Sequence, residues 1–280
     1  MKIAILSDIH GIYPALRIVS EHAARWRPDF TVVNGDVVNR GPLSRDCWNF
    51  VRERQEEEGW KVTGGNHEAY VAGWADRSRP RHGSRFGVHR SSYWTFRQLG
   101  GVVDGLAELP DQIELVAPDG SRVRFTHASM RGRSDGIYAD TPEETLCRQI
   151  SPAPAVFCTA HTHKPLLRCV NGTLIVNSGS VGYTFDGDPR ASYMQLSWHR
   201  GKWHAHTVRL RYDRELAARS FFKSGFMSEG GPLTQVFFRE WREARPLINR
   251  WIPQYQERVL AGEMDLAASV EEFLESVGAG

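Results

Sequence analysis

The chain has 280 residues and nearly balanced charge, with 35 Lys and Arg against 33 Asp and Glu, so its formal net charge is +2. Hydrophobic residues make up 41% and charged residues 24%, which is ordinary for a globular protein with a sizeable core. This small net charge excludes a global electrostatic attraction to nucleic acid or to a membrane surface. No apolar run approaches the roughly 20 residues that span a bilayer.

Cysteine usage and the N-terminal sequence bear on the compartment. The four cysteines lack the C-x-x-C spacing of a zinc knuckle, so we expect free thiols in a reducing cytoplasm rather than a disulfide framework. The chain enters an apolar run at residues 2–6, which leaves no room for a signal peptide, and a cytoplasmic location without a membrane anchor is expected. The cysteines are Cys47, Cys147, Cys158 and Cys169.

Strand-like and helical patterns alternate in the first 65 residues. Three apolar runs have the length of buried strands, at residues 2–6, 30–34 and 60–63. Helices are predicted between them from Pro14 to about Arg25 and from Ser44, as the cap, to Gly59. This order implies a parallel core with right-handed crossovers.

Residues 70–100 form a basic insertion that holds six arginines and one acid, Asp76. Because Pro80 and several glycines interrupt it, we expect a loop in the middle and a helix from about Ser91. A solvated loop is the simpler interpretation of segment 77–97. The aromatic residues between its arginines also suit contact with a phosphate ester or stacking on nucleic acid bases.

From Gln112 onward the apolar period becomes two, and three turn pairs mark hairpins. A helix with a capping-box pattern begins at Thr141, and a further strand is predicted at 155–159. A parallel first half and a largely antiparallel second half predict an α/β fold, a four-layer α-β-β-α sandwich of two mixed sheets. The turn pairs are Asp119-Gly120, Asn171-Gly172 and Arg200-Gly201.

The pattern becomes helical near the C-terminus, with helices predicted at 236–257 and 264–277. We therefore divide the chain into a main domain at 1–212 and a helical C-terminal extension at 213–280 packed on it. The aromatic residues of the extension are expected to pack against the main domain. A lid over a site or a homodimer interface is the alternative interpretation.

Side chains that bind metals follow most of the predicted strands. Because open α/β sheets place ligands at the carboxyl ends of strands, we expect these side chains to meet. Asp8 and His10 are two residues apart, so in an extended segment both would point the same way. Asp36 can offer one oxygen to each of two cations, and mixed imidazole, carboxylate and amide ligands suit Mn²⁺, Fe or Zn²⁺. The set is Asp8, His10, Asp36, Asn66, His127, His161 and His163.

These residues occur in five sequence blocks that cover the chain to about residue 210. The blocks are Asp8-Ile9-His10, Gly35-Asp36, Gly65-Asn66-His67-Glu68, His127 and Ala160-His161-Thr162-His163. In order and spacing they resemble the calcineurin-like metallophosphoesterase superfamily. The resemblance implies two divalent cations bridged by a hydroxide that attacks phosphorus. It assigns the first cation to Asp8, His10, Asp36 and His163, and the second to Asp36, Asn66, His127 and His161.

The same resemblance assigns catalytic roles beside the cations. Asp36 would bridge the two ions, and His67 would sit near the leaving group as a general acid or help to hold the phosphate. Arg40 takes the place of the phosphate-binding arginine of the protein-phosphatase branch, although a turn-stabilising ion pair is the rival interpretation. That branch has Asp where this chain has Asn39, so the residue that would pair with His67 carries no negative charge. Glu68 is the candidate to compensate.

The resemblance implies a phosphoesterase acting on small phosphate esters, nucleotides among them, as a phosphodiesterase or a broad phosphatase. Residues 177–182 resemble the bacterial and archaeal phosphodiesterase branch. A protein serine/threonine phosphatase and a dinucleoside polyphosphate hydrolase are alternatives that differ in substrate rather than in chemistry. A non-enzymatic binding module is the alternative from another class, and it is disfavoured because no ligand is missing. A nucleic acid partner would rest on the arginine segment alone.

Overall fold

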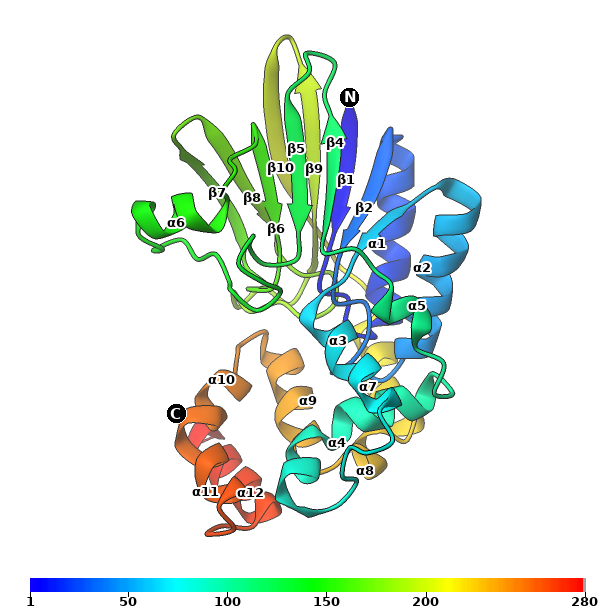
Figure 1. Ribbon diagram of the computed structural model, residues 1–280. Coiled ribbons are helices and arrows are strands. Elements are labelled where there is room, and N and C mark those ends of the chain that lie inside the picture. Colours follow the sequence, from blue (N-terminus) through cyan, green and yellow to red (C-terminus); the bar gives the residue numbers. More distant parts are fainter. Residues whose placement is uncertain (279–280) are drawn as a thin grey trace.

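The computed structural model describes residues 1–278, and the strand at its N-terminus lies in the middle of a five-stranded sheet (Figure 1). The strand order is β10-β9-β1-β2-β3. β1, β2 and β3 are parallel, β9 is antiparallel to β1, and β10 is antiparallel to β9. The strands are β1 (Lys2–Leu6), β2 (Phe30–Asn34), β3 (Lys61–Thr63), β9 (Ala191–His199) and β10 (Lys202–Leu210).

A second five-stranded sheet has the order β4-β5-β6-β8-β7. β5, β6 and β8 are parallel, whereas β4 and β7 pair antiparallel with β5 and β8 at the two edges. The three predicted hairpins are therefore confirmed, and both sheets are mixed. The strands are β4 (Gln112–Val116), β5 (Arg122–Thr126), β6 (Val156–Thr159), β7 (Pro165–Val170) and β8 (Thr173–Ser178).

Successive strand residues face two different hydrophobic cores. In β1, Ile3 and Ile5 belong to the core between the sheets, whereas Ala4 and Leu6 belong to the core beneath the helices of the outer layer. A third, smaller core packs a helix on the outer face of the second sheet. These layers confirm the four-layer α/β sandwich. The outer helices are α1 (Tyr13–Trp26), α2 (Ser44–Glu58) and α6 (Glu143–Gln149).

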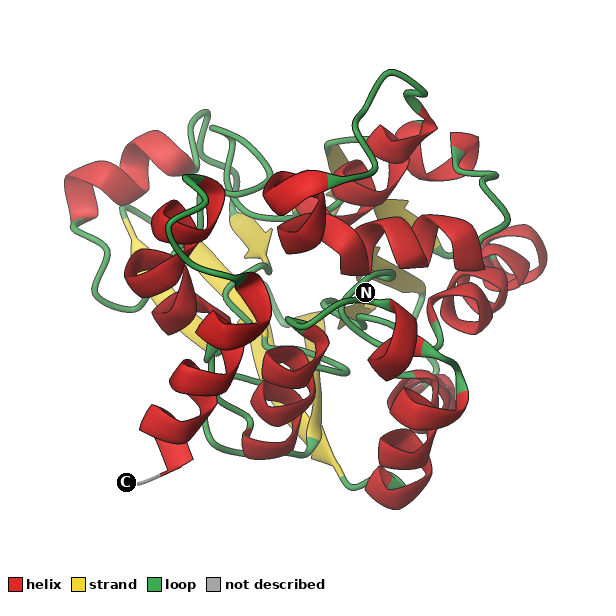
Figure 2. Cartoon of the chain, turned by 90° about the horizontal axis from the view of Figure 1, so that it is seen from below, coloured by secondary structure: helices red, strands yellow, loops and turns green. Residues whose placement is uncertain are grey.

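The remaining helices gather at one end of the sheets, below the carboxyl ends of the parallel strands (Figures 1 and 2). α4 contacts α8, α11 and α12, so the basic insertion and the C-terminal extension pack together. The helices are α3 (Asn66–Ala72), η1 (Gly73–Ala75), α4 (Gly83–Gln98), α5 (Asp104–Ala107), α7 (Arg214–Lys223), α8 (Phe226–Glu229), α9 (Thr234–Glu243), α10 (Ile248–Trp251), the π-helix η2 (Ile252–Gln256), α11 (Glu257–Leu260) and α12 (Leu266–Gly278).

Two helix predictions are wrong in extent. α4 begins at Gly83 rather than near Ser91, because Pro80 precedes the helix instead of interrupting it. The helix predicted at 236–257 is broken, since Ala244 ends α9 in a left-handed conformation (φ 54°) and Pro246 disfavours helical backbone at the residue before it.

Two predicted caps are also wrong. The Ser44 hydroxyl accepts a hydrogen bond from the backbone of Asn39, and the Thr141 hydroxyl accepts one from the backbone of Tyr138. Both side chains thus brace the loop before the helix instead of its first turn.

Aromatic side chains anchor the C-terminal extension, as predicted. Five of them are at most 7% exposed, whereas Phe222 is 58% exposed. Each of the four cysteines is a free thiol. None of the described helices is both long enough and apolar enough to cross a membrane. The five buried side chains are Phe221, Phe226, Phe237, Trp241 and Trp251.

Candidate metal centre

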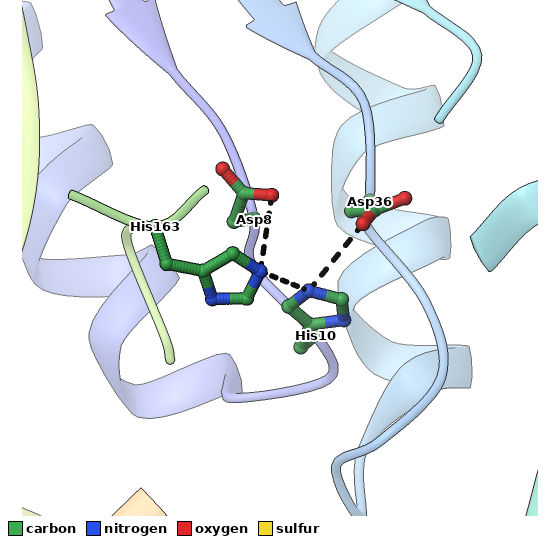
Figure 3. Close-up of side chains that lie close together, drawn as sticks. All are labelled: Asp8, His10, Asp36 and His163. Atoms are coloured by element: carbon green, nitrogen blue, oxygen red, sulfur yellow. Dashed lines mark hydrogen bonds and ion pairs between the residues drawn. The ribbon is translucent and has the colours of Figure 1, made fainter. Parts of the chain in front are cut away.

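The loops that follow β1, β2 and β6 bring four predicted ligands around one point (Figure 3). His163 Nε2 lies 3.4 Å from Asp8 Oδ1, and His10 Nε2 lies 3.5 Å from Asp36 Oδ2. The two imidazoles approach each other at 3.2 Å between their Nε2 atoms. All four residues are buried, so this group is the first ligand set that the sequence predicts.

The second set shares Asp36 with the first. His127 Nε2 lies 3.2 Å from Asp36 Oδ2 and 3.1 Å from Asn66 Oδ1. His161 Nδ1 lies 2.9 Å from the same Asn66 oxygen. All seven predicted ligands therefore converge, and Asp36 stands between the two groups as a bridging carboxylate would.

The polar atoms of this centre fit divalent cations. Both carboxylate oxygens of Asp8 and one of Asp36 are buried and have no hydrogen-bond partner among residues 1–278. An unpaired buried carboxylate is costly unless a cation compensates it. Burial raises the pKa of Asp8 to about 8, and the neighbouring Asp36 carboxylate adds to the rise. Burial works against charge on His127 as well, but Asp36 outweighs it and raises the pKa of His127 to about 10. The centre thus requires positive charge.

In two of the histidines, the hydrogen bond made by Nδ1 determines that Nε2 faces the centre. His127 Nδ1 donates to the backbone carbonyl of Asn34 at 2.8 Å, and His163 Nδ1 donates to the carbonyl of Tyr183. In the neutral ring each bond places the proton on Nδ1, so Nε2 would offer its lone pair to a cation that replaces the second proton of His127. This arrangement is the usual support for a metal-binding imidazole.

The backbone at most of these ligands is left-handed. This conformation is uncommon for residues other than glycine and is typical of functional sites held by their surroundings. The prediction that Asp8 and His10 lie in an extended segment is therefore wrong, because alternate left-handed residues turn both side chains into the same centre. The residues concerned are Asp8 (φ 51°), His10 (48°), Asp36 (56°), His161 (66°) and His163 (58°).

Glu68 holds the loop that carries Asp36. Its carboxylate accepts hydrogen bonds of 2.7–3.2 Å from the backbone nitrogens of Asp36, Val37, Val38 and Gly65. The expectation that Glu68 compensates beside His67 is therefore wrong, since its oxygens are engaged elsewhere. Glu68 is the third residue of α3, and its bond from the Gly65 nitrogen is the half of a capping box that needs no side chain at the N-cap.

Asn39 sets the tautomer of His67. The amide nitrogen of Asn39 donates to His67 Nδ1 at 2.8 Å. The proton of neutral His67 then lies on Nε2. Burial lowers the pKa of His67 to about 3, and the Arg40 guanidinium contributes to this fall although Asp36 opposes it. His67 is therefore a neutral hydrogen-bond donor rather than an imidazolium.

Arg40 is tied to the C-terminal extension, which sequence reasoning missed. Its guanidinium bonds Glu240 at 2.8 Å, and Glu240 also accepts from the backbone nitrogen of Ile248 at 2.8 Å. The side chain of Glu240 is 0% exposed, and burial raises its pKa to about 7. Arg40 Nε is buried without a partner in the described chain, and the side chain also lines a cavity beside the centre. The alternative interpretation of Arg40, an ion pair that stabilises its turn, is thus correct about the ion pair. The partner, however, is 200 residues away in the sequence.

A cavity of about 470 Å³ opens beside the centre. Its inner side is formed by Asp36, Asn66, His67 and His161, and its outer side includes residues of α4 and of the C-terminal extension. The arginines of segment 77–97 are absent from the described lining. Two of them instead stack on aromatic rings, Arg79 on Trp74 and Arg81 on Tyr93, at 4.4 and 5.1 Å from the ring centres.

The family model described as calcineurin-like phosphoesterase matches residues 1–188. The chain therefore belongs to the calcineurin-like phosphoesterase family, and it is a metal-dependent hydrolase of phosphoesters by class. No curated protein matches the chain.

Two solved structures extend the comparison. A metallophosphoesterase from Sphaerobacter thermophilus is 26% identical with a TM-score of 0.66, and the match covers 87% of this chain and 99% of that one. A hypothetical protein from Pyrococcus horikoshii OT3 is 17% identical with a TM-score of 0.69, over 83% of this chain and 97% of that one. The second likeness concerns the fold alone.

Proposed function

We propose that this protein hydrolyses small phosphate esters with two divalent cations that share Asp36. The observation that carries the proposal is the set of buried oxygens of Asp8 and Asp36 that have no partner within residues 1–278 and are placed among four histidines. Asp8, His10, Asp36 and His163 would hold one cation, and Asp36, Asn66, His127 and His161 the other. Mn²⁺, Fe or Zn²⁺ suits this donor set.

When bound, the cations supply a hydroxide from water and offset the charge on the phosphate oxygens. The protein's own groups position the ester. Arg40 and His67 both line the cavity, and their N–H groups would donate to phosphate oxygens or to the leaving oxygen. Ester hydrolysis consumes one water, and the P–O bond to the leaving alcohol breaks. Because His67 is neutral, it assists departure as a hydrogen-bond donor.

The cavity supports a small ester as substrate. Its volume of about 470 Å³ lies in the range of small-molecule sites, and helices wall it on the side away from the sheets. We therefore favour a phosphodiesterase or a broad phosphatase over an enzyme that acts on folded phosphoproteins.

Turnover of two chromogenic esters tests the proposal. The full chain, stripped of metal and reloaded with Mn²⁺, is assayed with p-nitrophenyl phosphate and with bis-p-nitrophenyl phosphate. We expect metal-dependent hydrolysis of at least one, and their ratio separates monoester from diester preference. Absence of turnover of both esters with Mn²⁺, Fe²⁺ and Zn²⁺ would overturn the proposal. Faster release of phosphate from a phosphoserine peptide than from either ester would favour a protein phosphatase.

A further inference from the structure

Part of the wall of the cavity beside the metal centre belongs to the C-terminal extension. Asn249 of α10, with Ile252 and Gln256 of η2, line it there, and Tyr70 and Val88 line it from α3 and α4. The family model ends at residue 188, so this wall lies outside the matched part of the chain. The inference that follows rests on the proposed function, because it concerns the organic group of the ester.

The wall is built as a rigid support. Trp251, Tyr255 and Val259 are buried on one side of the helix and pack toward α12, where the Trp251 indole donates to the Ser269 hydroxyl at 3.3 Å. Ile252 and Gln256, together with Trp251, line the cavity. The intervening turn is a π-helix, a rare form that occurs often at functional sites.

The chemistry of the lining selects the kind of organic group. Tyr70 and Ile252 are large apolar side chains left 47% and 41% exposed, which suits contact with the faces of a planar ring. Asn249 and Gln256 offer amides, which pair with the edges of nucleobases. Asp36 is the only carboxylate among the described lining residues, so nothing there compensates a cationic group such as an amine or choline.

We propose that the C-terminal extension forms a binding site for the nucleoside of a nucleotide ester, with Asn249, Ile252 and Gln256 as its specificity residues. The phosphate lies at the metal centre, and the base lies between Tyr70 and Ile252 with its edge toward the two amides. These three residues of the extension contact the organic group. The reacting atoms are contacted by the strand-end loops, which are the loops that follow β1, β2, β3, β5 and β6 and carry the predicted metal ligands.

Two diesters with the same leaving group test this site. They are thymidine 5′-(p-nitrophenyl phosphate) and methyl p-nitrophenyl phosphate. We expect kcat/KM to be roughly tenfold higher for the thymidine ester, since stacking one base contributes on the order of 1–3 kcal/mol. Ile252→Arg should remove this advantage, because KM should rise for the thymidine ester and not to the same degree for the methyl ester. For a strict monoesterase, thymidine 5′-phosphate and methyl phosphate replace the diesters, with phosphate release as the readout.

Leu260→Arg is the matched control, because Leu260 is 40% exposed on the neighbouring α11 and lies outside the cavity lining. It should change neither substrate's kinetics. Calorimetric titration with thymidine alone measures binding without turnover. Thymidine binding should be lost in Ile252→Arg and retained in Leu260→Arg. Equal use of the two esters, or equal thymidine binding by both variants, would overturn the site. Failure to hydrolyse any ester, with thymidine binding intact, would overturn the proposed function and leave the nucleoside site standing.

Discussion

The strand-end loops and the C-terminal extension contribute to the same cavity in different ways. The loops supply charged and metal-binding groups held by left-handed backbone and by the buried Glu68 carboxylate. The extension supplies neutral side chains on short helices and one buried carboxylate, Glu240, that pairs with Arg40. Under the proposed function, the loops carry the chemistry and the extension recognises the organic group of the ester. Substitutions in the loops should therefore lower kcat/KM for all ester substrates, and substitutions in the extension should lower it only for some of these substrates.

Asp36→Asn should have the largest effect. Removing the shared carboxylate weakens both ligand sets, so kcat/KM should fall roughly a thousandfold for every ester, as expected when several kcal/mol of charge stabilisation are lost. Steady-state kinetics with saturating Mn²⁺ measures the loss. Asp46→Asn, on the exposed side of α2, is the control and should stay within twofold. Near-normal turnover by Asp36→Asn would refute a shared-carboxylate centre.

Glu68→Gln should come next. The amide keeps one acceptor and turns its NH₂ toward backbone N–H groups, so the loop that carries Asp36 loosens. Supports of this kind typically contribute ten- to a hundredfold to metal affinity or activity, and we expect that loss in both, measured by kinetics and by Mn²⁺ titration. The exposed Glu56→Gln serves for comparison, since its side chain is 68% exposed. Equal behaviour of the two variants would mean that the loop needs no such brace.

Arg40→Met tests the link between the two regions. It leaves the Glu240 carboxylate buried and unpaired, so the free energy of unfolding should fall by roughly 3–5 kcal/mol. The double variant Arg40→Met/Glu240→Met should regain most of this stability but none of the lost activity. Urea unfolding and kinetics on the same samples separate the two effects. Recovery of activity in the double variant would show that Arg40 is only a counter-ion.

Glu240→Gln should have the smallest effect and a defined pH dependence. The pKa of Glu240 is about 7 in the folded chain against a reference of 4.5, so the folded state holds an additional proton in that window. The wild type's free energy of unfolding should therefore fall relative to Glu240→Gln as pH rises from about 4.5 to 7, and the difference should be level below and above. A pH-independent difference in urea unfolding curves would contradict the raised pKa.

The sequence predicts more of the loops than of the extension, for physical reasons. The ligands occur at the ends of predicted strands, so the rule that parallel strands present their carboxyl ends at one edge brings all seven together. Asp8 and His10 converge through left-handed residues that no periodicity reveals. In the extension, the sequence shows a helical pattern over 236–257. The end of α9 at Ala244 is not evident from that pattern, because it depends on Pro246 together with tertiary packing.

Local sequence patterns do not predict contacts between residues that are far apart in the chain. Arg40 and Glu240 are 200 residues apart in the chain, and no sequence pattern around either residue indicates the pair. The same holds for Asn39: its lack of charge is visible in the sequence, but its hydrogen bond to His67 is visible only in the fold. Such pairs are set by how helices dock on the sheet, which composition and spacing do not encode locally.

Elemental analysis of the purified full chain tests the central claim most directly. After dialysis against Mn²⁺ or Zn²⁺ and removal of free ions, the wild type should carry two cations per chain, and Asp36→Asn should carry at most one. A wild-type chain that retains no divalent cation, or an Asp36→Asn chain with an unchanged metal count, would contradict the account.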